Sequence, residues 1–195
     1  MLKFGDWINR KRHNRGFGIQ SPSAFFFITQ VLKEKRPYYA YRELDRIIAE
    51  CGGMSRRCAR ELFRITNYLK PDNCIAVASV AAAHAMKAAR PKVPFYILET
   101  GTEKEFLEIM DKCTEPGMLY IGNTPHRSAL LETAMSRTNN RSAIVIEGIS
   151  RDKASRELWQ KIIDDQRTIV TYDMHRYGLL LFDREKKKQN YKLKR

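Results

Sequence analysis

Apolar residues change their spacing along the chain near Pro71. Before that point they recur every three or four residues, which is the period of an amphipathic helix. The pattern predicts three helices there: one that starts at Ser21 and stops before Pro37, one over residues 41–50 and one over residues 55–69. Ser21 offers a capping hydroxyl, and the proline after it suits the first turn of a helix. The first seventy residues are therefore expected to be helical.

After Pro71, short apolar runs alternate with amphipathic segments of about ten residues. The pattern predicts strands over residues 74–78, 95–98, 118–121, 143–146, 168–173 and 178–182, and helices over 82–89, 103–112, 128–135 and 152–163. Strands that alternate with helices are typical of a parallel sheet covered on both faces. Only a few residues join the last two strands, which allows an antiparallel hairpin but no helical crossover. The sequence thus predicts an α/β fold, a mostly parallel sheet with its last strand antiparallel.

The composition narrows the class of protein. A chain of 195 residues with 43% hydrophobic residues can bury a core. It has no run of about 18 apolar residues that could span a membrane, and basic residues between 10 and 15 stand where a signal peptide would be apolar. The four cysteines show no zinc spacing, which favours free thiols in a reducing compartment. We expect a cytoplasmic protein without membrane contact.

The net charge of +14 is concentrated at the two ends of the chain. Residues 1–15 hold five basic and one acidic residue, and residues 183–195 hold seven basic and two acidic residues. This division predicts a helical extension over residues 1–70 that packs on the core, an α/β core over 71–183 and a basic C-terminal tail over 184–195. Nucleic-acid binding through such ends would be weak and independent of base sequence.

Several stretches of the chain resemble a known family. They are Arg15–Phe25, which includes Gly18 and the Ser21-Pro22 pair, Pro37–Ala40, Leu62–Pro71 and Tyr177–Leu179. Together with the antiparallel last strand, they resemble the bacterial class I S-adenosylmethionine-dependent methyltransferases, which have a Rossmann-like fold. The resemblance implies a cofactor at the carboxyl ends of the first strands, where open α/β sheets bind their ligands.

The cofactor loop that this resemblance implies is altered here. In such enzymes the first strand ends in an acidic residue and a glycine-rich turn. This chain has Ala76 in place of the acid, and it has Ala78 and Ala82 in place of glycines, with Ser79 in the same turn. An alanine held in a left-handed conformation costs about 1–2 kcal/mol, and its methyl group narrows the space for the cofactor. We expect S-adenosylmethionine to bind weakly or not at all.

Three further positions correspond to the family's site. Glu99 follows the second strand, where the family's acid accepts hydrogen bonds from both ribose hydroxyls; its alternative role is that of a solvated acid that caps the next helix. Gly122 stands where relatives carry an aspartate. Glu147 ends a later strand, but one carboxylate does not make an octahedral oxygen site. No metal is therefore expected.

The third βα unit of the family, which shapes the adenine side of the pocket, is missing from the sequence. Only about five residues separate the helix predicted over 103–112 from the next strand. We therefore expect an altered sheet edge and an altered adenine wall.

These observations favour a methyltransferase-like protein with a degraded cofactor site, and hence a non-catalytic binding or scaffold protein without an assigned catalytic residue. The first alternative is an active class I O-methyltransferase with an unorthodox cofactor loop. The second is a nucleic-acid binder that uses its basic ends. Phe25, Phe26 and Phe27 are expected in the core or at a contact between two copies of the chain, which would make the protein a homo-oligomer.

Overall fold

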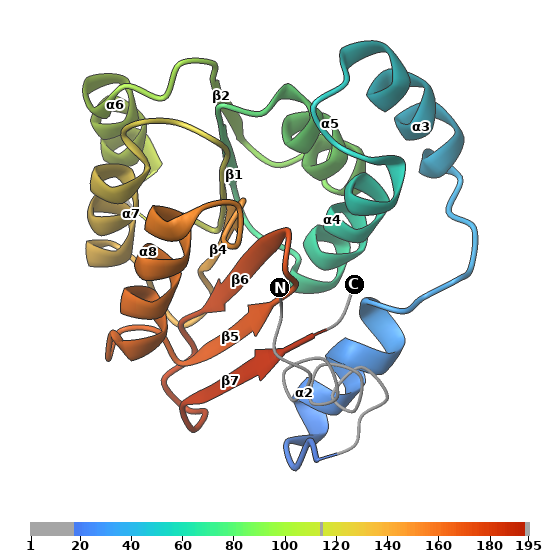
Figure 1. Cartoon of the computed structure of the whole chain (residues 1–195). Helices are drawn as coiled ribbons and strands as arrows, with labels where there is room; N and C mark the ends of the chain where they lie inside the picture. Colours follow the sequence, from blue (N-terminus) through green and yellow to red (C-terminus); the bar gives the residue numbers. More distant parts are fainter. Residues whose placement is uncertain (1–17, 114, 194–195) are drawn as a thin grey trace.

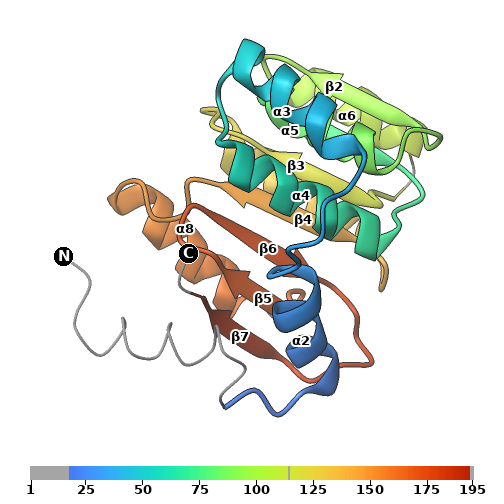
Figure 2. The same ribbon diagram turned by 90° about the vertical axis from the view of Figure 1, so that its right-hand side faces the viewer.

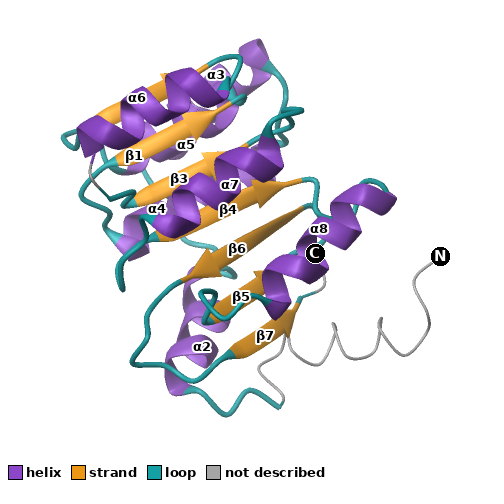
Figure 3. Cartoon of the chain, turned by 90° about the vertical axis from the view of Figure 1, so that its left-hand side faces the viewer, coloured by secondary structure: helices purple, strands orange, loops and turns teal. Residues whose placement is uncertain are grey.

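The fold is built on a seven-stranded sheet. The computed structural model describes residues 18–113 and 115–193, and the basic residues at 1–15 lie outside this part. In the described part, the strand order is β2-β1-β3-β4-β6-β5-β7, as Figure 3 shows. The strands are β1 (Cys74–Val77), β2 (Phe95–Leu98), β3 (Met118–Ile121), β4 (Ala143–Glu147), β5 (Val170–Asp173), β6 (Tyr177–Leu181) and β7 (Gln189–Lys192).

The strand directions confirm the predicted α/β fold. β1 pairs in parallel with β2 and β3, and β3 pairs in parallel with β4. β6 lies between β4 and β5 and runs antiparallel to both. Only three residues separate β5 from β6, and so short a connection permits an antiparallel pair alone.

A seventh strand corrects the prediction of a C-terminal tail. β7 pairs in parallel with β5, with Val170 opposite Gln189 and Asp173 opposite Lys192. The prediction of a tail over residues 184–195 is therefore wrong for residues 189–192. Their hydrophobic pattern is weak, and they form the edge of the sheet because their main chain pairs with β5.

Helices cover both faces of the sheet. They are α2 (Pro22–Phe26), the π-helix η1 (Phe27–Val31), α3 (Ala40–Cys51), α4 (Arg56–Leu69), α5 (Val80–Ala89), α6 (Glu103–Cys113), α7 (Arg127–Ser136) and α8 (Lys153–Asp164). Figure 2 shows α2, α3 and α4 on one face, and Figure 3 shows α6, α7 and α8 on the other. One core joins the first group to alternate strand positions such as Cys74 and Tyr120, and a second core joins α6–α8 to the positions between them, such as Ile75 and Ile121. The strands are apolar throughout because both of their faces are buried.

The structure confirms that the third βα unit is missing. Between β2 and β3, the described residues form the helix α6 and no strand. α6 packs in the same core as α7 and α8, on the face opposite α5. The chain therefore passes from β2 directly to the opposite face, and β2 becomes the edge of the sheet.

The first predicted helix is shorter and less regular than expected. α2 begins as predicted, because the Ser21 hydroxyl accepts a hydrogen bond from the Ala24 amide. After Phe26 the chain forms a π-turn, and its last carbonyls, those of Val31 and Leu32, accept hydrogen bonds from the buried Arg64 guanidinium at 2.8 Å each. A side chain of α4 thus satisfies the end of this helix, which spacing within residues 21–37 could not predict.

The three phenylalanines of this region have different surroundings. Phe27 lies in the core, whereas Phe25 and Phe26 are 45% and 49% exposed. The expectation of core packing is met by Phe27 alone, and a contact between copies of the chain stays a prediction for the other two. Among the described residues, no helix combines the length and apolar character needed to cross a bilayer.

Candidate functional site

The connections reverse direction around β1, which makes the carboxyl end of this strand the expected ligand site. From β1 the chain moves to β2 on one side, and from β2 it returns across β1 to β3 on the other side. In open α/β sheets such a switch point carries a crevice for ligands at the carboxyl ends of the strands. Three connections border it here: those that follow β1, β2 and β3 (Figure 1).

The turn after β1 is pulled tightly against the start of the connection after β3. The Ala78 amide donates a hydrogen bond to the Leu98 carbonyl, and the Gly122 amide donates to the Val77 carbonyl, both at 2.8 Å. A Cβ atom on Gly122 would lie only 2.4 Å from the Ala78 carbonyl oxygen. Backbone therefore packs on backbone at this point.

Ala78 and Ala82 differ in conformation, which corrects one expectation. Ala78 has a φ of +53°, so it carries the left-handed strain expected of an alanine in a glycine position. Ala82 instead lies within α5, where its amide donates to the hydroxyl of the N-cap residue Ser79 at 3.3 Å. Ala82 thus requires no left-handed backbone. The expectation of strain at Ala82 is wrong, because α5 begins before this residue.

The connection after β2 crosses over the end of β1. Gly101 has a φ of +64°, and a Cβ atom on it would lie 2.4 Å from Val77 Cγ1. Beside it, the Thr124 hydroxyl donates a hydrogen bond to the Thr100 carbonyl at 3.4 Å. The chain therefore bridges from the end of β2 to the connection after β3, over the strand between them. This backbone lies beside the switch point, where open α/β sheets bind their ligands.

Glu99, the residue expected to hold a ribose, is exposed at the edge of this bridge. It forms no hydrogen bond or ion pair with another described residue. The start of α6 is capped instead by Thr102, whose hydroxyl donates to Glu105 at 2.8 Å and accepts from the Glu105 amide at 3.4 Å. The hydrogen bond from Thr102 lowers the pKa of the Glu105 carboxyl. The alternative role of Glu99 as a helix cap is therefore wrong.

Two other expected site residues, Ser79 and Glu147, lie near Tyr120. Tyr120 and Glu147 line the same cavity, and both Glu147 and Ser79 are close enough to the Tyr120 phenol to influence its pKa. Burial raises the pKa of the Glu147 carboxyl and raises that of the Tyr120 phenol well above its ordinary value. A cavity of about 100 Å³ opens beside this group, lined also by Cys58 and Arg176.

A buried pair supports the wall of this cavity. The Tyr177 hydroxyl donates to the Glu61 carboxylate at 2.6 Å, and both side chains are almost completely buried. Arg127, the first residue of α7, approaches the end of β4 from another helix. Its guanidinium donates to the Glu147 carbonyl at 3.0 Å and to the Ser155 hydroxyl at 2.9 Å. Sequence analysis did not select Glu61, Tyr120 or Tyr177, and no local signal marks them, because their partners come from distant segments.

The cavity beside Glu147 is small. Pockets that enclose drug-sized molecules measure about 300–1,000 Å³, and the cavity beside Glu147 is several times smaller than most of that range. Within the part of the chain that the structure describes, no three His, Cys, Asp or Glu side chains group to hold a metal ion.

Comparison with known proteins identifies the fold. No family model and no curated protein matches the sequence. Among solved structures, the O-methyltransferase TomG from Streptomyces achromogenes, solved with SAM, superposes with a TM-score of 0.51 and 11% identity over 80% of this chain and 94% of that one. The SAH-bound methyltransferase PaMTH1 of Podospora anserina gives a TM-score of 0.56 and 11% identity over 93% and 98%. The chain therefore has the class I methyltransferase fold.

Proposed function

We propose that this chain is a non-catalytic binding protein that uses the methyltransferase fold without its cofactor. The observation that carries the proposal is the backbone bridge over β1, where Gly101 rests on Val77 and Thr100 is tied to Thr124. We expect this bridge to take up part of the space that a cofactor at the switch point would need. The residues present do not fit S-adenosylmethionine.

The loss of side-chain partners acts in the same direction. Ala76 is completely buried and offers no carboxylate, where an acid would form a charge-assisted hydrogen bond of about 1.5–3 kcal/mol. That term alone corresponds to about one to two decades of affinity. The strain at Ala78 adds nothing to this loss, because the free protein already holds the residue at positive φ. Opening the backbone bridge over β1 would add a further free-energy cost to cofactor binding.

Calorimetric titration with S-adenosylhomocysteine tests the proposal, because it requires no knowledge of a methyl acceptor. We expect a dissociation constant of about 1 mM or weaker, with a catalytically active methyltransferase of the same fold as positive control. A dissociation constant of about ten micromolar or better would overturn the proposal and favour an active enzyme.

The active-enzyme alternative is supported by one observation. Glu99 is exposed at the carboxyl end of β2 and is not engaged in the α6 cap. If it binds a ribose, Glu99→Gln should weaken the binding of S-adenosylhomocysteine about tenfold, whereas Glu105→Gln in the neighbouring cap should leave it unchanged. Equal binding by wild type and Glu99→Gln would remove this alternative.

A further inference from the structure

A second feature of the chain lies away from the crevice, where α4 meets the segment that follows η1. These elements border an open cleft of about 530 Å³. Six cationic side chains line it: Lys33, Lys35, Arg56, Arg57, Arg60 and Arg64. Only three acidic side chains face them. The cleft thus combines concavity with an excess of positive charge, an arrangement that concentrates anions.

The three acids of the cleft are already engaged within the protein. Asp45 forms an ion pair with Arg60, and its carboxylate accepts from the guanidinium Nε at 3.0 Å. Glu61 accepts from Tyr177 in the core. Glu34 accepts from a backbone amide at 2.8 Å, and this hydrogen bond lowers the pKa of its carboxyl. Glu61 also forms an ion pair with Arg64 at 3.9 Å. Among the described residues, none of the three acids forms an ion pair with Arg56 or Arg57.

Arg56 and Arg57 are the cations best placed to meet a ligand. Both are exposed, and neither forms an ion pair with a residue in the described part of the chain. They occupy the first turn of α4, a 14-residue helix with no acidic residue in that turn. Cations at a helix N-terminus interact unfavourably with the helix dipole, so these two arginines do not stabilise α4 through its dipole. An anion bound between them would interact favourably with both the arginines and the helix.

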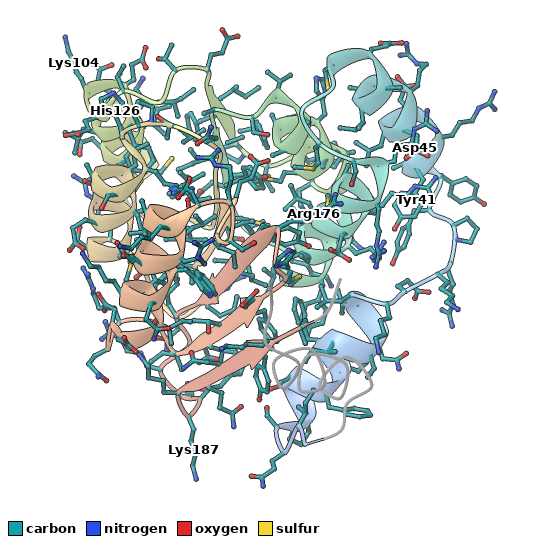
Figure 4. The ribbon with its side chains drawn as sticks, viewed as in Figure 1. Tyr41, Asp45, Lys104, His126, Arg176 and Lys187 are labelled. Carbon is teal, nitrogen blue, oxygen red and sulfur yellow. The ribbon has the colours of Figure 1, made fainter. Side chains whose placement is uncertain are left out.

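The C-terminal lysines, by contrast, are partly committed to the protein. Lys186 forms an ion pair with Asp183 at 3.0 Å, and the Lys188 ammonium donates to the Asp165 carbonyl. Figure 4 places Lys187 beyond the end of the sheet, far from Asp45 at the cleft. The cleft at α4 is therefore lined by more cationic side chains than the pocket that Lys186 and Lys187 line.

An aromatic side chain accompanies the cleft. Tyr39 follows Lys35 and Arg36 in the segment that borders it, and it precedes the first residue of α3. Its side chain is fully exposed, and its ring has no aromatic neighbour among the described residues, whereas Tyr38 and Tyr41 pack on Phe63. Tyr39 is outside the lining of the cleft, two residues before Tyr41, whose ring lies 4.8 Å from the Arg60 guanidinium. Proteins bind single-stranded nucleic acids with exposed rings near arginines, because bases stack on the ring and phosphates bind the guanidinium groups.

We propose that this cleft binds the phosphodiester backbone of a single-stranded nucleic acid, with Tyr39 as a stacking surface for a base. The forked donors of Arg56 and Arg57 match phosphate oxygens in geometry as well as in charge. An acidic protein segment would match the charge alone and would leave the aromatic ring without a role. Recognition of this kind is independent of base sequence. The proposal does not depend on the cofactor crevice, which other residues form.

The first test measures the salt dependence of binding to a fluorescent 20-nucleotide oligothymidylate by anisotropy, with the full chain. Arg56→Gln combined with Arg57→Gln should reduce the slope of log affinity against log salt by roughly 0.7 per lost contact, about 1.4 in total. The control combines Lys186→Gln with Lys187→Gln, which removes the same charge at the C-terminus and should leave the slope unchanged. Circular dichroism would verify that both variants are folded.

The proposal would be overturned if the salt dependence of binding fell only in the variant that lacks Lys186 and Lys187. It would also be overturned if the wild type showed no salt-dependent binding. Tyr39→Ala separates nucleic acid from other polyanions. This substitution should weaken the affinity for the oligothymidylate about fivefold or more, because one stacked base is lost. It should leave the affinity for heparin unchanged. A 20-residue polyglutamate peptide that binds as tightly as the oligonucleotide would overturn the proposal in favour of an acidic protein partner.

Discussion

Replacement of Ala78 by glycine should stabilise this protein, whereas the same replacement at Ala82 should destabilise it. The two alanines lie four positions apart, and both stand where glycine would be expected from the family resemblance. Ala78 has a φ of +53°, and Ala82 is completely buried in α5. Opposite signs are expected because only the first residue has a backbone that glycine adopts more readily than alanine.

The magnitudes follow from these environments. Relief of the left-handed conformation at Ala78 is worth about 1–2 kcal/mol, and the greater freedom of glycine in the unfolded chain cancels about 0.4–1 kcal/mol of it. The net gain is on the order of 0.8 kcal/mol. At Ala82, glycine loses about 1 kcal/mol of helix propensity and about 0.8 kcal/mol of buried methyl. The expected loss is close to 2 kcal/mol.

Urea denaturation and thermal unfolding of the two variants check both values. For a chain of this size, 1 kcal/mol corresponds to about 2–4 °C in Tm. Ala78→Gly should therefore raise Tm by about 2–3 °C, and Ala82→Gly should lower it by about 4–8 °C. Destabilisation by Ala78→Gly, or equal shifts in the two variants, would show that the positive φ at this turn carries no strain.

Three further outcomes are expected. Gly122→Ala should destabilise the protein by about 1–3 kcal/mol in urea, because its Cβ would lie 2.4 Å from the Ala78 carbonyl oxygen; unchanged stability would contradict the tight contact. A hydrogen bond from the backbone at the start of α8 lowers the pKa of Asp152 to about 2. Its stabilising effect is therefore complete above pH 4 and declines as the pH falls toward 2, so the stability difference between wild type and Asp152→Ala should shrink over that range and not widen. Burial raises the pKa of the Cys74 thiol to about 12, so a thiol reagent should label Cys51 in the native protein and reach Cys74 only after unfolding.

The sequence by itself determined the class of fold and the order of its elements. The strands over residues 95–98 and 118–121 have the predicted limits, and the antiparallel direction of β6 follows from the short connection before it. The missing βα unit was equally visible, because too few residues separate α6 from β3. Periodicity and connection length are local properties, and local sequence is sufficient to fix them.

The tertiary structure decided the features that join distant segments. The sequence showed that alanines replace the expected glycines, but which alanine is strained depends on where α5 begins. The bridge that crosses β1 depends on how the connections after β2 and β3 pack against each other. The Tyr177–Glu61 hydrogen bond joins residues 116 positions apart, and Arg64 binds carbonyls more than 30 positions before it. Buried polar groups must find partners wherever the fold places them. β7 is held at the edge of the sheet by its pairing with β5 rather than by its own hydrophobic pattern. Such contacts arise from packing in three dimensions, because the residues that make them carry no signal of one another along the chain.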